Sequence, residues 1–271
     1  CPGHSACAQP AAVQHDSARL PGLSRLTWEH LHREGLHQLE HILENTPDDL
    51  RRIKGIGRAR ALDLLAFAEA VIQQMPVMRG SLPEVARSLG VMLDLETRLD
   101  DGQVWCFGWQ GADGRFQAAI VDRYFEGDKL QLPDGQMITI IENSDEGWRL
   151  VAEAAQQLPG PVYHWGNFEK GVLRATAPAD VIEILDTRLH DLNRTFKQTC
   201  MLPVRGTSIK KVAPYLGFHW PEGSNVFAAW GDYNVWLRDG NADALARACA
   251  YNRADVEALA IIWQWLLDNS P

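Results

Sequence analysis

The sequence predicts an α/β fold, a mixed sheet with flanking helices that follows a small all-α domain. Two observations lead to this prediction. Apolar residues recur at helix-like intervals from about residue 23 to 75. From residue 91 onward, short apolar or alternating runs lie between Gly- and Asp-containing turns, which is typical of strands, and helical patterns are interleaved with them. A stretch that contains Pro76, Gly80 and Pro83 separates the two regions and predicts the domain boundary.

The composition is that of a folded globular chain. Hydrophobic residues make up 46% and charged residues 23% of the 271 residues, which argues against a wholly disordered or fibrous protein. The net charge of −9 is unfavourable for a surface that binds nucleic acid everywhere, so any nucleic-acid contact is expected to be local. No apolar run reaches the roughly 18 residues that span a bilayer, and no signal-peptide pattern opens the chain. We therefore expect a cytoplasmic location and no membrane partner.

Three regions are expected along the chain: a tail over residues 1–20, a helical domain over 21–78 and a larger domain over 88–271. The tail carries Pro2, Gly3 and Pro10 and shows little periodicity. Because the chain begins with cysteine, it is expected to be a fragment or a processed form. An odd, scattered set of five cysteines argues against a disulfide framework: Cys1, Cys7, Cys106, Cys200 and Cys249.

The helical domain contains a Gly-Ile-Gly segment between two helical patterns, which is typical of a helix-hairpin-helix. Two glycines permit a tight turn and leave backbone N–H groups free at the start of the second helix, where they suit a phosphate. Positive side chains flank the turn. The predicted nucleic-acid contacts are therefore Lys54, Gly55, Ile56, Gly57 and Arg58. The alternatives are a plain helical bundle with a glycine turn, or a surface that docks another protein.

The larger domain is predicted to begin with strands and to continue with helices. A short turn-like segment, Gly231-Asp232-Tyr233-Asn234, is expected to lie on the surface. Strands are expected at 91–97, 104–109, 116–121, 137–141 and 161–163, and helices at 145–157, 169–175 and 180–185.

Acidic residues in three separate segments indicate a metal-dependent nuclease. Asp94 and Glu96 are two apart in a predicted strand, so both carboxylates leave the same face. Tyr251 and Asp255 are four apart in a helical stretch and also share a face. Together with Glu169, these carboxylates are the ligands that Mg²⁺ or Mn²⁺ prefers, and a pair of such ions suits phosphodiester hydrolysis. Each pattern taken alone is also common in solvated turns and surface helices.

The three segments resemble the motifs of the RNase H-like DEDD exonucleases, tyrosine subclass. Asp94 and Glu96 match the Asp-x-Glu motif of the first strand, and Tyr251 and Asp255 match the Tyr-x-x-x-Asp motif. The middle motif usually ends in Phe-Asp, whereas Phe168-Glu169 stands here. The resemblance implies an RNase H-like sheet and a 3′ to 5′ exonuclease that acts on single-stranded DNA, with DNA favoured over RNA, in DNA repair or processing.

One branch of this superfamily is particularly similar, the YprB-like or predicted RecB-family nucleases. That branch has Glu in its Tyr-His-x-x-x-x-Glu segment, and the segment from Ser208 to Ala213 also resembles it. The branch implies a helicase or an upstream RecB-like nuclease domain as partner. It also implies a cysteine cluster, in which Cys1 and Cys7 would be the last two ligands of an iron–sulfur site of a longer parent chain. Two unpaired thiols are the alternative.

The resemblance also implies roles for individual residues. The four carboxylates would hold two ions, and Tyr251 would orient the attacking water, because an unperturbed tyrosine is too weakly acidic to act as a strong base at neutral pH. Lys210 would contact a phosphate, Trp165 would stack on an unpaired base, and Asp191 would order the structure around them. Most other tryptophans are expected in the core. The alternatives are a nucleic-acid-binding module without turnover and a partner-docking domain of a larger nuclease or helicase.

Overall fold

The computed structural model describes residues 15–111 and 113–271. The chain forms two compact units. The first contains the residues up to Ser81 together with 197–212 and 269–271, and the second contains Leu82–Phe196 and Ala213–Asp268. Within the described residues, no helix has both the length and the apolar character needed to cross a membrane.

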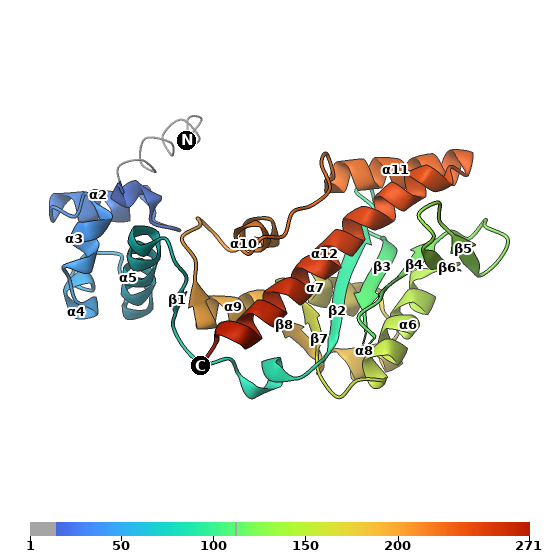
Figure 1. Ribbon diagram of the computed structural model, residues 1–271, viewed down its shortest axis with the longest axis horizontal. Coiled ribbons are helices and arrows are strands. Elements are labelled where there is room, and N and C mark those ends of the chain that lie inside the picture. Colours follow the sequence, from blue (N-terminus) through green and yellow to red (C-terminus); the bar gives the residue numbers. More distant parts are fainter. Residues whose placement is uncertain (1–14, 112) are drawn as a thin grey trace. The chain divides into compact units, whose positions relative to one another are not determined.

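The first unit is mainly helical, as the apolar spacing predicts. Its core is formed by Phe67 and buried aliphatic residues, which come from four helices and from the segments that connect them. A short antiparallel pair, β1 (Val77–Met78) with β9 (Cys200–Met201), adds the later segment to this unit. The four helices, shown in blue and teal in Figure 1, are α2 (Arg25–Arg33), α3 (Leu39–Leu43), α4 (Pro47–Leu50) and α5 (Arg58–Gln73).

The second unit is built on a seven-stranded mixed sheet with the order β5-β6-β4-β3-β2-β7-β8. Strands β2, β3 and β4 form an antiparallel meander, while β7 and β8 run parallel to β2 and β6 runs parallel to β4. Consequently β2, β4, β6, β7 and β8 all end at the same edge of the sheet. The strands are β2 (Val91–Thr97), β3 (Val104–Gln110), β4 (Phe116–Val121), β5 (Lys129–Gln131), β6 (Met137–Ile141), β7 (Val162–His164) and β8 (Leu189–Asp191).

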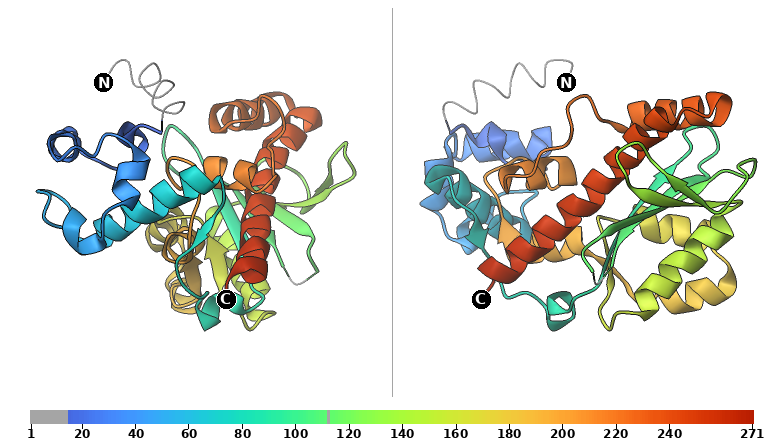
Figure 2. Two further views of the ribbon diagram at one scale, coloured as in Figure 1. Left: turned by 60° about the vertical axis from the view of Figure 1, so that its left-hand side comes forward. Right: turned by 45° about the vertical axis from the view of Figure 1, so that its right-hand side comes forward.

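Helices cover both faces of this sheet. Helices α6 (Ser144–Gln156), α7 (Phe168–Thr176) and α8 (Ala179–Leu185) pack on one face, over a core that includes Leu93 and Leu95 of β2. Helices α11 (Val226–Asp239) and α12 (Ala242–Asn269) pack on the opposite face, and the long α12 runs obliquely across the strands (Figures 1 and 2). Because side chains alternate along β2, Asp94 and Glu96 point to the α12 side. Shorter elements complete the chain: η1 (Ser17–Arg19), η2 (Glu84–Arg87), α9 (Leu192–Thr199) and α10 (Ile209–Tyr215).

The predicted mixed α/β fold is confirmed, and several strands have the predicted bounds. The surface turn predicted at Gly231-Asp232-Tyr233-Asn234 is wrong, because these residues lie within α11. Ala229, Tyr233 and Trp236 are buried at helical spacing, so their packing outweighs the poor helix propensity of Gly231. The three-residue strands β5 and β8 were not predicted, since runs of that length carry little periodic signal.

Candidate metal centre

Three carboxylates meet where α12 crosses β2. One oxygen from each of Asp94, Glu96 and Asp255 lies within 4.8 Å of the others. Glu96 and Asp255 are buried, and Asp94 is half-buried. Period-2 alternation directs the two strand carboxylates to one face, and the oblique course of α12 brings the helix carboxylate to them. The sequence-predicted residues of the first and third acidic segments are therefore brought together.

A buried amide fixes Asp94 in this group. Asn252, which is fully buried on α12, donates from Nδ2 to Asp94 Oδ2 at 2.7 Å and to the Asp94 carbonyl oxygen at 3.3 Å. Its Oδ1 is buried without a hydrogen-bond partner in the described structure. Gly108 lies opposite Asp94 in the β2–β3 register, and a Cβ there would lie only 1.6 Å from Asn252 Oδ1. No role was predicted from the sequence for Asn252 or Gly108. The only signal for Asn252 was that a polar residue directly follows Tyr251.

Two further side chains surround Asp255. Trp220 donates from Nε1 to Asp255 Oδ1 at 2.7 Å, although no role beyond the core was predicted for this tryptophan. Tyr251, one helical turn before Asp255, is buried. Burial raises the pKa of the Tyr251 hydroxyl, and the charges of Asp255, Glu96 and Asp94 raise that pKa further. The hydroxyl therefore stays protonated at neutral pH, and it lies within hydrogen-bond reach of the Asp255 carboxylate.

Glu169 lies in the first turn of α7 and is also buried. It is not part of the close group that the other three carboxylates form in the described structure. Its Oε2 lies 3.2 Å from Nδ1 of His164, the last residue of β7, which is buried as well. This contact gives His164 a hydrogen-bonded role beside Glu169.

The loop that connects β7 to α7 is held by Asp191 at the end of β8. Asp191 Oδ1 accepts from the backbone N–H of Gly166 at 2.9 Å and from that of Arg194 at 3.1 Å. Gly166 has a φ of +98°, a conformation that glycine adopts without strain. Trp165 in this loop is half-buried, and its ring centroid lies 6.0 Å from that of Phe196. Asp191 thus orders the loop instead of joining the carboxylate group.

The residues predicted to contact phosphate all lie in the first unit. Gly55, with a φ of +94°, turns the chain between α4 and α5, and Gly57 is the N-cap of α5. Ile56 is buried in the core of the unit, whereas Lys54 and Arg58 are exposed. Lys210 is an exposed residue of α10. Cys1 and Cys7, predicted as iron–sulfur ligands, lie outside the described residues.

The donor set of the carboxylate group fits a hard divalent cation. Carboxylate oxygens are the preferred ligands of Mg²⁺ and suit Mn²⁺ equally well. Three negative charges within 4.8 Å of one another, two of them buried, repel each other unless protons or a cation neutralise them. A divalent ion held by Asp94, Glu96 and Asp255 would remove this repulsion, so the site is a candidate metal centre.

Comparison with known families agrees with this geometry. The family model described as the RNase H superfamily matches residues 91–267, which cover the sheet, both layers of helices and all three carboxylates. No curated protein and no solved structure matches the chain significantly.

Proposed function

Because the chain belongs to the RNase H superfamily, whose domains are commonly nucleases, we propose that it is a metal-dependent nuclease that hydrolyses phosphodiester bonds. The observation that carries this proposal is the group formed by Asp94, Glu96 and Asp255. A strand and a helix that together present three converging carboxylates have the ligands that metal-assisted phosphoryl chemistry needs. The family match over the same residues supports the assignment, because it covers every member of the group.

The finer activity that we propose is a DEDD-type 3′ to 5′ exonuclease on single-stranded DNA. Asp94, Glu96 and Asp255 would hold Mg²⁺ or Mn²⁺, with Glu169 as a further ligand for a second ion. Bound ions supply Lewis acidity and lower the pKa of a water molecule at the scissile phosphate. The Tyr251 hydroxyl, which stays protonated beside Asp255, would position a water molecule at the scissile phosphate. Asn252 holds the Asp94 carboxylate in place, and Trp220 does the same for Asp255.

The first unit would strengthen binding of the nucleic acid. We propose that the α4–α5 turn acts as a helix-hairpin-helix, in which the free amides at the start of α5 bind a phosphate. The turn conformation of Gly55 and the exposure of Lys54 and Arg58 support this role. Two residues that are closer in sequence to the nuclease motifs would also contact the nucleic acid. Trp165 would stack on a base, and Lys210 would contact a phosphate. DNA repair or processing in the cytoplasm, with a helicase or an upstream nuclease domain as partner, is the proposed setting.

A second candidate function is a nucleic-acid-binding module without turnover. The position of Glu169 favours it, since this carboxylate contacts His164 and is not in the group of three. A site with three ligands and no fourth carboxylate would hold one ion more readily than two.

Cleavage of end-labelled substrates separates these two functions. Single-stranded and duplex DNA and RNA would be incubated with Mg²⁺ or Mn²⁺ and either the intact chain, Asp94→Asn or Asp255→Asn. We expect metal-dependent cleavage of single-stranded DNA, with a loss of about a hundredfold or more in both variants, because each isosteric change removes a charged ligand. Asp239→Asn, at an exposed carboxylate paired with Arg238, is the control and should keep full activity.

The lengths of the labelled products show whether degradation starts at the 3′ or the 5′ end. The nucleic acid that is cleaved fastest shows the substrate class. Binding of DNA without any cleavage by the intact chain would favour the module without turnover. Equal cleavage by the intact chain and both site variants would show that the chemistry takes place elsewhere.

A further inference from the structure

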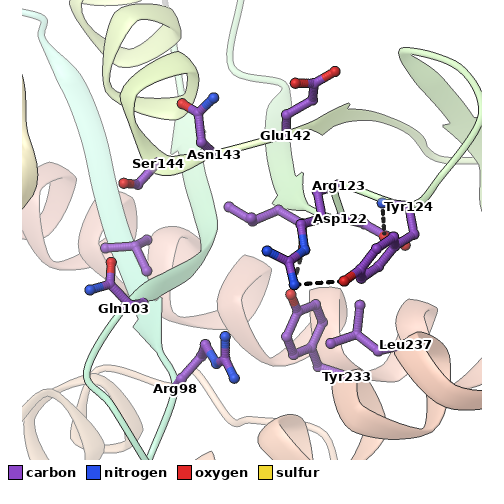
Figure 3. A pocket seen from close by; sticks show the side chains of 12 residues that line it. Arg98, Gln103, Asp122, Arg123, Tyr124, Glu142, Asn143, Ser144, Tyr233 and Leu237 are labelled. Carbon is purple, nitrogen blue, oxygen red and sulfur yellow. Dashed lines mark hydrogen bonds between the residues drawn. The ribbon is translucent and has the colours of Figure 1, made fainter.

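A second feature of the nuclease unit is a polar pocket of about 390 Å³ at the edge of the sheet where β2 and β4 end. Residues from the turn after β2, from the segment after β4, from the start of α6 and from α11 surround it. Figure 3 shows Arg98, Gln103, Arg123 and Tyr233 arranged around this space. None of these side chains belongs to the carboxylate group.

The pocket lies close to the candidate metal centre along the same strand. Arg98 follows Glu96 by two residues, so their Cα atoms can be at most about 7 Å apart. Its backbone N–H donates to the carbonyl oxygen of Gln103 at 2.8 Å, so the turn that carries it is tied to β3. Tyr233 packs in the same core cluster as Tyr251, on the α12 face of the sheet. A polynucleotide bound at the carboxylates would therefore pass near the pocket.

Two guanidinium groups line the pocket with donors that could be used for a ligand. Arg98 forms long ion pairs of 3.5 Å with Asp100 and Asp101, and its guanidinium carbon lies 5.8 Å from the centre of the Trp230 ring. Its Nε is buried and has no hydrogen-bond partner among the described residues. Arg123 donates to the hydroxyl of Tyr124 at 2.6 Å, and its guanidinium carbon lies 4.7 Å from the centre of that ring. Tyr124 is 77% exposed, so its ring is accessible to a ligand.

The acidic residues of the pocket limit the charge that it can accept. Asp122 accepts from the backbone N–H of Tyr124 through one oxygen and from Trp236 Nε1 through the other, both at 3.0 Å. Glu142 is the second carboxylate of the lining. With these two carboxylates in the lining, and with Asp100 and Asp101 beside Arg98, the pocket has no net positive charge. It therefore suits the single negative charge of a phosphodiester better than the several charges of a nucleoside triphosphate.

We propose that this pocket binds a nucleotide of the substrate strand next to the bond that is cleaved, with its phosphate between Arg98 and Arg123 and its base against Tyr124. Arginine donors suit phosphate oxygens, and an exposed aromatic ring stacks on any base without sequence preference. This assignment rests on the proposed nuclease function, and it adds a strand-positioning site to the metal centre.

Fluorescence anisotropy with a fluorescein-labelled oligothymidylate tests this site, with Ca²⁺ in place of Mg²⁺ to limit cleavage. Arg98→Gln and Arg123→Gln should each raise the Kd about tenfold, because each removes a charge-assisted hydrogen bond. The slope of log Kd against log salt concentration should fall by about 0.7 for each lost phosphate contact. Arg98→Lys should keep the slope while it weakens binding. Arg149→Gln, at an exposed arginine of α6 that pairs with Asp180, is the matched control and should change neither quantity.

Tyr124→Ala tests the stacking contact separately. It should weaken binding of oligothymidylate by up to about tenfold and leave the binding of an abasic oligonucleotide unchanged, because the abasic strand has no base to stack. An unchanged Kd and salt slope in both Arg→Gln variants, with an intact chain that cleaves DNA, would overturn the pocket assignment alone. An intact chain that neither binds nor cleaves any nucleic acid would overturn the pocket assignment and the proposed nuclease function together.

Discussion

At the scale of single residues, the candidate metal centre depends on neutral neighbours as well as on its carboxylates. Asn252 donates to Asp94 and Trp220 donates to Asp255, so two of the three acidic side chains are oriented by an N–H group. Gly108 leaves the space that the Asn252 amide occupies. Hydrogen bonds to a ligand's outer oxygens fix its direction, which is why such partners affect metal affinity without touching the ion.

Substitution of Asn252 tests this orienting role. Asn252→Ala removes the donor at 2.7 Å from Asp94 Oδ2, so we expect the affinity for Mn²⁺ to fall by about 10- to 100-fold. Isothermal titration calorimetry measures this affinity without any need for turnover. Asn234→Ala is the control, because Asn234 is an exposed residue of α11 whose Nδ2 donates to the backbone carbonyl of Trp230 in the same helix. An unchanged Mn²⁺ affinity in Asn252→Ala would show that Asp94 does not need this donor.

At the scale of elements, the site depends on how closely the helices approach the sheet. Gly147 in the first turn of α6 faces the ring of Phe107 on β3, where a Cβ would lie 2.3 to 2.8 Å from three ring carbons. The same ring packs edge-on against Trp148, with centroids 5.2 Å apart. The absence of a side chain at Gly147 thus sets the distance between α6 and β3, the strand that also carries Gly108.

Two helical glycines should respond to alanine in opposite directions. Gly147→Ala should lower the free energy of unfolding by about 1 to 3 kcal/mol, because the new methyl group overpacks the interface with Phe107. Gly171→Ala in α7, where the new methyl group would meet open space, should raise it by about 0.4 to 1 kcal/mol by restricting the unfolded chain. Urea denaturation monitored by circular dichroism measures both values. Equal effects of the two substitutions would contradict this account of the α6 interface.

The sequence predicts a large part of these elements, because their signals are local. Alternation along β2 is enough to place Asp94 and Glu96 on one face, and the spacing of Tyr251 and Asp255 is enough to pair them on a helix. Contacts between distant segments leave no such pattern. Trp220 reaches Asp255 across 35 positions and Asn252 reaches Asp94 across 158, so neither role could be predicted from spacing. The pocket at Arg98 and Arg123 likewise depends on the pairing order of the strands.

At the scale of the whole molecule, the chain joins a helical unit to a nuclease-like unit. The match to the RNase H superfamily lies over 91–267, and the carboxylate group belongs to the second unit. The first unit supplies exposed basic residues on a glycine turn, which would let a chain with a net charge of −9 contact phosphate locally.

Binding of Mn²⁺ is the measurement that tests the central claim most directly. Titration followed by electron paramagnetic resonance should show Mn²⁺ bound by the intact chain and binding that is lost or strongly weakened in Asp94→Asn and Asp255→Asn. Asp239→Asn should bind as the intact chain does, because its carboxylate lies outside the group. Equal Mn²⁺ binding by the intact chain and both site variants would contradict the assignment of these carboxylates as the metal centre.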